Sequence, residues 1–169
     1  MFGVLGKIFK TGCLTEPLPA HNREVMQLGL VCKKEIARIF GKSLAIRMVD
    51  AGSCNGCELE IHALNNGFYD IERFGIHFVA SPRHADLLLV TGPVARHMQA
   101  ALKGTYDATP DPKLVIAMGD CGADGGEFGV SYASCGAVAN VIPVDAVIRG
   151  CPPSPLHLLQ GILDLLGRR

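Results

Sequence analysis

Short apolar runs of strand length recur along most of this chain and alternate with segments of helical character. The runs are Leu44 to Val49, Ile76 to Ala80, Asp86 to Thr91 and Lys113 to Met118. The third run is almost wholly apolar, which is typical of a strand buried on both faces. Strands that alternate with helices form a parallel, doubly wound sheet with right-handed crossovers. The sequence therefore predicts an α/β fold with its helices on both faces of one sheet.

The intervening segments complete this pattern. Helices are predicted over Glu58 to Asn65, from Gly92-Pro93 to about Leu102, and over Leu156 to Leu166, the second with proline in its first turn. Gly119 to Gly129 is dense in glycine and is predicted to be a loop. The segment from Val138 to Ile142 is short and apolar, and a last loop at Gly150 to Pro155 follows the region from Val141 to Ile148.

The first 43 residues differ from the remainder. Phe2, Val4, Leu5, Ile8 and Phe9 are broken by glycine and lysine, which suits a short amphipathic segment on a membrane surface or a partner; a tail against its own domain is the other interpretation. Arg23 to Phe40 has an apolar stripe of helical spacing. We therefore divide the chain into an N-terminal extension, residues 1–43, and an α/β domain, residues 44–169.

Charge and composition exclude several classes of protein. The formal net charge is zero, aromatic residues make up 6% and tryptophan is absent, so neither a basic field nor stacking surfaces favour nucleic acid. No apolar run approaches the roughly 20 residues that span a bilayer, and no secretory signal is recognisable. We expect a cytoplasmic protein that is soluble or peripheral to a membrane.

Seven cysteines are many for 169 residues, and in a reducing compartment clustered cysteines indicate metal or redox chemistry. Cys54 and Cys57, Cys121, and Cys151 lie in glycine-containing loops that each follow a strand-like segment. In parallel sheets such loops meet at the carboxyl edge. Four thiolates are the ligands of a [4Fe–4S] cluster, and neighbouring glycines let the backbone approach its sulfides.

Two other interpretations of these cysteines stay open. A structural zinc site takes four thiolates, usually from two C-x-x-C pairs, whereas this chain has one pair and two widely spaced single cysteines. A thioredoxin-like dithiol needs no distant partners. Cys13, Cys32 and Cys135 are left over, and Cys32 lies on the apolar helical stripe, where a core position is expected.

Two carboxylates, Glu58 and Glu60, follow the C-x-x-C pair. A carboxylate beside a redox centre could relay protons, and we name both residues as candidates for that role. A solvated helix face is the common alternative for such residues. We assign no catalytic residue in the bond-making sense.

The segments CNGCELEI, SPRHADLLLVTGPV, DPKLVIAMGDCG and VIPVDAVIRGCPP together resemble the small subunit of membrane-bound group 4 [NiFe] hydrogenases, of the formate hydrogenlyase and hydrogenase-4 type. The same superfamily contains the cluster-bearing 20 kDa subunit of respiratory complex I. The resemblance covers about Leu44 to Leu166. It implies a flavodoxin-like sheet with one [4Fe–4S] cluster at the carboxyl strand edge, held by the four cysteines that match the family's ligands: Cys54, Cys57, Cys121 and Cys151.

The resemblance also implies a function and a set of partners. The chain would relay electrons from a ferredoxin-like iron–sulfur subunit to the Ni–Fe site of a hydrogenase large subunit, as one oxidoreductase subunit of a hetero-oligomer with antiporter-like membrane subunits. It would lie at the cytoplasmic side of the membrane. The alternative is a complex-I-like subunit that passes electrons to quinone; complex I carries two adjacent cysteines here, whereas this chain has Cys54-Asn55-Gly56-Cys57. Neither a twin-arginine leader nor a long C-terminal extension is recognisable, which resembles the short, membrane-associated branch.

Overall fold

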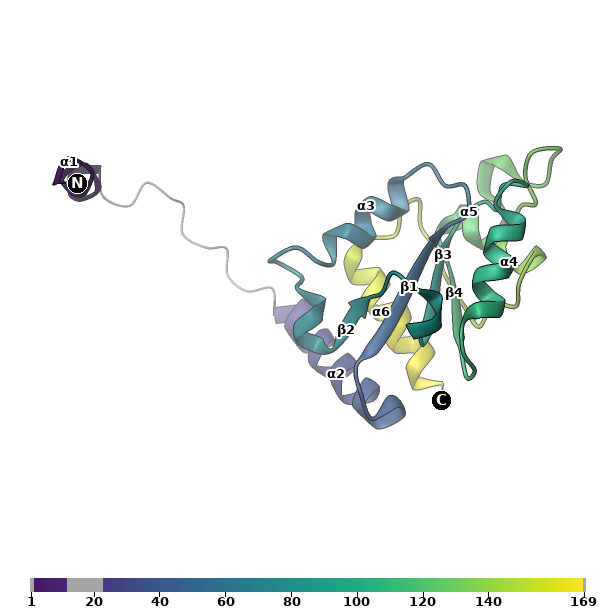
Figure 1. Ribbon diagram of the computed structural model, residues 1–169, viewed down its shortest axis with the longest axis horizontal. Coiled ribbons are helices and arrows are strands. Elements are labelled where there is room, and N and C mark those ends of the chain that lie inside the picture. Colours follow the sequence, from purple (N-terminus) through teal and green to yellow (C-terminus); the bar gives the residue numbers. More distant parts are fainter. Residues whose placement is uncertain (1, 12–22, 169) are drawn as a thin grey trace.

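A computed structural model of the protein describes residues 2–11 and 23–168, with residues 1, 12–22 and 169 outside the described part. The sheet has five parallel strands in the order β2-β1-β3-β4-β5 (Figure 1). This is the strand order of flavodoxin-like folds, and it confirms the predicted doubly wound α/β architecture. The strands are β1 (Leu44–Asp50), β2 (Ile76–Phe78), β3 (Leu87–Thr91), β4 (Leu114–Met118) and β5 (Ala146–Ile148).

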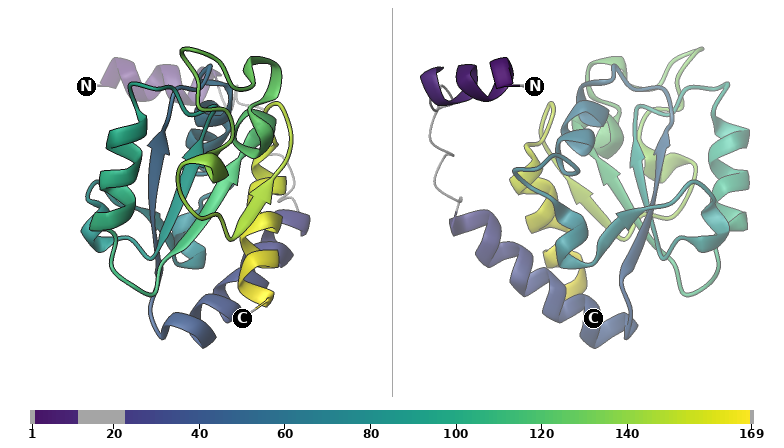
Figure 2. Two further views of the ribbon diagram at one scale, coloured as in Figure 1. Left: turned by 90° about the vertical axis from the view of Figure 1, so that its right-hand side faces the viewer. Right: turned by 60° about the vertical axis from the view of Figure 1, so that its left-hand side comes forward.

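Helices cover both faces of the sheet. Figure 2 shows α4 on one side of the strands and α2 with α6 on the other. The buried residues agree, because α2, α3 and α6 contribute to one hydrophobic cluster and α4 to a second. The α-helices are α1 (Phe2–Thr11), α2 (Arg23–Phe40), α3 (Gly56–Ala63), α4 (Gln99–Ala108), α5 (Gly119–Asp124) and α6 (Pro155–Gly167), and the short 3₁₀ turns are η1 (Ile71–Phe74), η2 (Pro82–His84), η3 (Gly126–Phe128) and η4 (Val138–Asn140).

The central strands are the most apolar and the most buried. Every residue of β3 and β4 is buried, as expected for strands that have neighbours on both sides and helices above and below. The outer strands β2 and β5 are only three residues long. Short edge strands leave few unpaired backbone groups for another chain to join.

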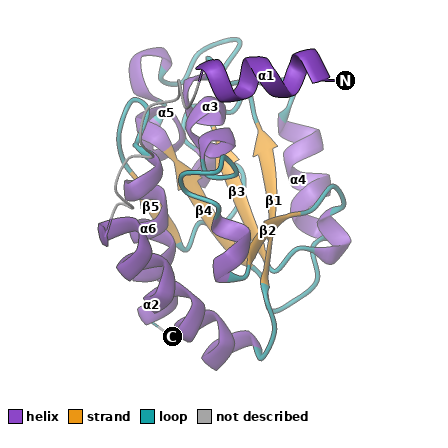
Figure 3. Ribbon diagram, turned by 90° about the vertical axis from the view of Figure 1, so that its left-hand side faces the viewer, coloured by secondary structure: helices purple, strands orange, loops and turns teal. Residues whose placement is uncertain are grey.

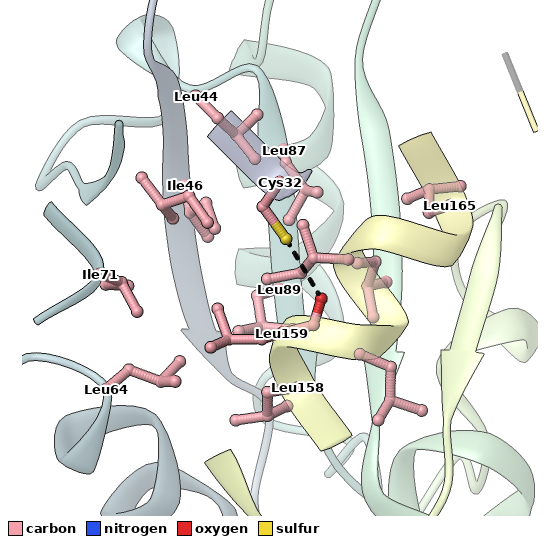
Figure 4. Packing of buried hydrophobic residues seen from close by; sticks show 14 of the residues in the cluster. Cys32, Leu44, Ile46, Leu64, Ile71, Leu87, Leu89, Leu158, Leu159 and Leu165 are labelled. Carbon is pink, nitrogen blue, oxygen red and sulfur yellow. Dashed lines mark hydrogen bonds between the residues drawn. The ribbon is translucent and has the colours of Figure 1, made fainter. Parts of the chain in front are cut away.

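The larger core cluster joins α2 and α6 to the sheet. The Cys32 thiol lies among leucines and isoleucines from β1, β3 and α6 and donates to the Leu159 carbonyl at 3.8 Å (Figure 4). Val25 and Ile36 of α2 are also almost fully buried. The expected core position of Cys32 is therefore confirmed. The division into an N-terminal extension, residues 1–43, and an α/β domain, residues 44–169, stays a prediction, although α2 packs as part of this core.

Three local predictions were wrong. The helix after Gly92-Pro93 begins only at Gln99 and extends to Ala108, because residues 94–96 instead bond to the 133–136 hairpin, as in the Cys135 N–H to Val94 carbonyl bond of 2.7 Å. The glycine-rich segment after β4 is not all loop, since its first six residues form α5. The strand that starts at Ile76 ends at Phe78, two residues early.

The N-terminal apolar segment forms the helix α1. Its Phe9 is 86% exposed, and which surface this helix contacts stays a prediction. Within residues 2–11 and 23–168, no helix is both long and apolar enough to cross a bilayer.

Candidate functional site: a cysteine-lined sheet edge

The strands all point toward one end of the sheet, where α3 and α5 lie (Figure 3). The loop between β1 and α3 is shaped by Asp50, whose Oδ1 accepts hydrogen bonds from Gly52 N–H (2.8 Å) and Ser53 N–H (2.9 Å). Asn55 then adopts a left-handed conformation, with φ 71°, and α3 starts at Gly56. This geometry leaves Cys54 exposed in the loop and buries Cys57 in the first turn of α3.

Cys121 lies in α5, directly after β4. A Cβ added at Gly126 would be 2.8 Å from the Cys121 Sγ, closer than real side chains approach. Gly126 has φ +52°, so it also suits the backbone conformation better than other residues do. Glycine at this position therefore leaves room beside the Cys121 sulfur.

The third loop follows β5 and places Cys151 near the other two. A Cβ at Gly119 would be 2.8 Å from the Cys57 Sγ and 3.5 Å from the Gly150 carbonyl oxygen. A Cβ at Gly56 would lie 3.5 Å from the Cys54 Sγ and 3.8 Å from the Pro152 ring. The three loops thus meet around these glycines. The predicted convergence of the loops at the carboxyl edge of the sheet is confirmed.

The thiols at this edge influence one another electrostatically. The pKa of the Cys57 thiol is raised to about 12, first by burial and then by the Glu58 carboxylate and the other three thiols. Burial also raises the pKa of Cys121, with added contributions from Cys151 and Cys54. Deprotonation of several of these thiols at the same time is therefore unfavourable in the chain by itself. A bound cationic group would be needed to keep them as thiolates.

The donor chemistry of this edge fits an iron–sulfur cluster. Four thiols come from three separate loops, and glycines at 119 and 126 keep side chains away from two of the sulfurs. Among the described residues, no group of three or more histidines, cysteines or acidic residues is close enough to hold a single metal ion. A cluster needs wider spacing of its ligands than one ion does, because its iron atoms lie between the sulfurs.

The two candidate carboxylates lie in different environments. Glu58 is only 4% exposed, and neither of its carboxylate oxygens has a hydrogen-bond partner among the described residues. Glu60 is partly exposed. A buried unpaired carboxylate beside Cys57 is costly to keep, so Glu58 is not an ordinary solvated helix residue. A proton-relay role for Glu58 or Glu60 stays a prediction.

The remaining cysteines do not join this set. Cys32 is in the core, and burial raises its pKa to about 11. Cys135 is buried in the hairpin that pairs Val130 with Cys135, where the Asn140 side chain donates to its carbonyl at 2.8 Å. Cys13 lies outside the described residues.

Sequence reasoning missed the charged residues beside the ligand loops. Arg149 precedes Gly150-Cys151, and Asp120 and Asp124 flank Cys121 in α5. The sequence does show these charged residues next to the predicted ligands. Their contact could not be predicted, because Arg149 reaches the two aspartates only when β4 pairs with β5.

The fold and this edge together define a class of protein: an α/β protein with the flavodoxin-like strand order and a carboxyl sheet edge lined by thiols. The family model described as NADH ubiquinone oxidoreductase, 20 kDa subunit, matches residues 54–165. The chain belongs to this family of oxidoreductase subunits.

Two curated relatives are similar over most of this chain. It is 45% identical to a probable membrane-bound hydrogenase subunit, mbhJ, of Pyrococcus furiosus, covering 76% of this chain and 77% of that protein. It is 44% identical to formate hydrogenlyase subunit 7 of Escherichia coli, covering 80% of this chain but only 53% of that protein. These relatives bear out the resemblance to hydrogenase small subunits.

A solved structure gives a third comparison. A chain of the membrane-bound sulfane sulfur reductase, described as an archaeal respiratory membrane complex, matches with a TM-score of 0.66 and 38% identity over 80% of this chain and 74% of that one. The relatives thus include subunits of membrane complexes with different reactions.

Proposed function

We propose that this chain is the electron-transfer small subunit of a membrane-bound [NiFe] hydrogenase complex. It would relay electrons between ferredoxin-like subunits and the Ni–Fe site of the large subunit. The observation that carries the proposal is the meeting of four thiols from three loops at one edge of the sheet. The proposed ligands of a single [4Fe–4S] cluster are Cys54, Cys57, Cys121 and Cys151.

When bound, such a cluster supplies one-electron chemistry at a potential that its surroundings set. The chain contributes the thiolates, the exclusion of water and the approach of backbone N–H groups. Cys57 is buried, whereas Cys54 and Cys151 are exposed. We therefore place the route of electron exchange on the Cys54 and Cys151 side, where a partner subunit can come close.

The surface near these loops supports docking of a partner. Large apolar side chains are exposed on α3 and on the segment after α5, and Tyr132 is 95% exposed. Apolar and aromatic side chains are enriched at the centres of protein interfaces. The exposed residues are Leu59, Phe128, Val130 and Tyr132. We assign this surface to the large subunit, in a complex whose antiporter-like subunits lie in the membrane and whose peripheral part faces the cytoplasm.

The test is metal analysis and EPR on the intact complex, comparing wild type with Cys121→Ala. Loss of one [4Fe–4S] signal, with nickel retained in the large subunit, is the expected result. Cys135→Ala is the matched control, because Cys135 is another free cysteine, buried on the hairpin that pairs Val130 with Cys135, and lies outside the proposed ligand set. It should keep the signal.

Other results would contradict the proposal at different levels. Zinc in place of iron in the wild-type complex would remove the redox function. Iron without nickel anywhere in the complex would keep the electron relay and move its acceptor to another reaction, such as reduction of quinone or sulfur compounds.

A second candidate function, transfer of electrons to quinone, is favoured by one observation. A cavity of about 650 Å³ lies between the end of β1, α3 and α4. Apolar side chains of Met48, Phe78 and Met98 line it together with Arg47, whose Nε is buried and has no hydrogen-bond partner among the described residues. Its size and mixed lining suit a ring with polar substituents.

Nickel analysis separates the two functions, and a cavity variant adds a second measurement. If quinone is the acceptor, Arg47→Ala should slow quinone reduction by the complex while leaving its iron content unchanged. If the Arg47→Ala complex holds nickel and evolves or consumes hydrogen at the wild-type rate, transfer of electrons to quinone is ruled out as its function.

A further inference from the structure

Arg149 joins two of the proposed ligand loops. Its Nη1 lies 2.8 Å from Asp124 Oδ2 and 3.9 Å from Asp120 Oδ1. Arg149 follows β5 and precedes Cys151 by two residues, whereas both carboxylates belong to α5, which contains Cys121. One side chain therefore connects the Cys151 loop to both ends of the helix that bears Cys121.

Two hydrogen bonds between Asp120 and Gly150 hold the same two loops together. The Asp120 N–H donates to the Gly150 carbonyl at 3.0 Å, and the Gly150 N–H donates to Asp120 Oδ1 at 3.1 Å. Asp120 directly precedes Cys121, and Gly150 directly precedes Cys151. These two hydrogen bonds join the residues that directly precede the cysteines, and so they hold Cys121 and Cys151 at a fixed separation.

The charges of this group act on the same edge. Asp120 and Asp124 place two carboxylates beside Cys121 in α5. Arg149 opposes them, and its hydrogen bond lowers the pKa of Asp124. Its positive charge is held within hydrogen-bond distance of one carboxylate and 3.9 Å from the other. The three residues thus form a small charge group whose net effect depends on Arg149.

We propose that Arg149, held by Asp120 and Asp124, is a positioning residue that adds a second link between the Cys121 and Cys151 loops and raises the reduction potential of the cluster. This inference rests on the proposed function. Reduction adds one negative charge at the sheet edge, so a nearby cation favours it and a nearby carboxylate opposes it. The ion pairs themselves are substantially exposed, so they contribute little to folding stability. The potential, rather than stability, is the property that distinguishes this role.

The experiment is an EPR-monitored redox titration of the intact complex with three single variants. Arg149→Gln should lower the midpoint potential and Asp124→Asn should raise it, each changing the ratio of reduced to oxidised cluster at a fixed potential by about two- to fivefold. Arg149→Lys keeps the charge and should stay near the wild-type potential. Asp124→Asn keeps an amide oxygen for the Gly126 N–H bond, so it preserves the end of α5 and still tests the charge if Arg149→Gln does not assemble.

If the midpoint potentials of Arg149→Gln and Asp124→Asn are unshifted and their iron content is full, this inference is wrong but the proposed function stands. Shifts in the same direction would also overturn the inference, because they would show loosening of the loops without the opposing effects of charge. A wild-type complex that contains no cluster would sink the proposed function, and this inference with it.

Discussion

Gly119 lies directly against Cys57, so that a Cβ at Gly119 would be only 2.8 Å from the Cys57 Sγ. Gly119 has φ +80°, a left-handed conformation that residues with a Cβ adopt at a cost. It is the point where the end of β4 meets the first turn of α3. The C-x-x-C pair and the Cys121 loop can approach each other only because this residue has no side chain.

Gly119→Ala should therefore destabilise the chain and impair binding of the proposed cluster. The left-handed backbone alone costs about 1–2 kcal/mol for alanine, and the contact with Cys57 adds to this. Urea unfolding of the chain and iron analysis of the complex would measure both effects. Gly104→Ala is the control, since Gly104 lies in α4 with nothing within 4 Å of an added Cβ; it should stabilise by about 0.5–1 kcal/mol. Equal effects of the two variants would contradict this account of Gly119.

Packing of α2 against the sheet can be tested on one helix. Ile36 is 2% exposed in the larger core cluster, whereas Leu30 is 54% exposed. Ile36→Ala should lower the free energy of unfolding by about 2–4 kcal/mol, and Leu30→Ala by no more than about 0.5 kcal/mol. If both variants unfold at the wild-type urea concentration, α2 is not part of the core and the boundary at residue 43 is the better description.

Cys32 should make stability fall in alkaline solution. Burial raises its pKa to about 11 from an ordinary value of 9.0, so the folded state keeps a proton that the unfolded state loses above pH 9. Its contribution is complete below pH 9 and disappears progressively up to about pH 11, a loss of roughly 2–3 kcal/mol. Urea unfolding between pH 8 and pH 11 should give a shallower decline for Cys32→Ala than for wild type. Parallel curves would mean that this thiol ionises freely in the fold.

Asp86 should matter more than the lysine with which it pairs. One of its oxygens accepts from the Ala45 N–H at 3.1 Å, and the other lies 2.9 Å from the exposed Lys42 Nζ. Asp86→Ala removes an acceptor from a partly buried backbone N–H and should cost about 1–3 kcal/mol. Lys42→Ala removes only a surface ion pair, worth less than about 1 kcal/mol. A larger loss in Lys42→Ala would reverse this assignment.

The central strands and the meeting of the cysteine loops could be predicted from the sequence for local reasons. Apolar runs such as the one that became β3 are continuous because a strand covered on both faces needs no polar residues. Parallel strands place their carboxyl ends at one edge, so cysteines that follow separate strands are brought together by topology alone. The start of α4 was not readable, because residues 94–96 pair with a hairpin that lies much further along the chain rather than continuing a helix.

The sequence by itself determined the α/β class, the strand-rich core and the set of cysteines that meet, since these follow from local pattern and strand direction. Only the tertiary structure decided that Gly119 must lack a side chain, that Glu58 is buried while Glu60 is partly exposed, and that Arg149 connects the Cys151 loop to α5. These features depend on distances between segments far apart in the chain. Such distances arise from how helices and strands pack, and no periodicity in the sequence records them.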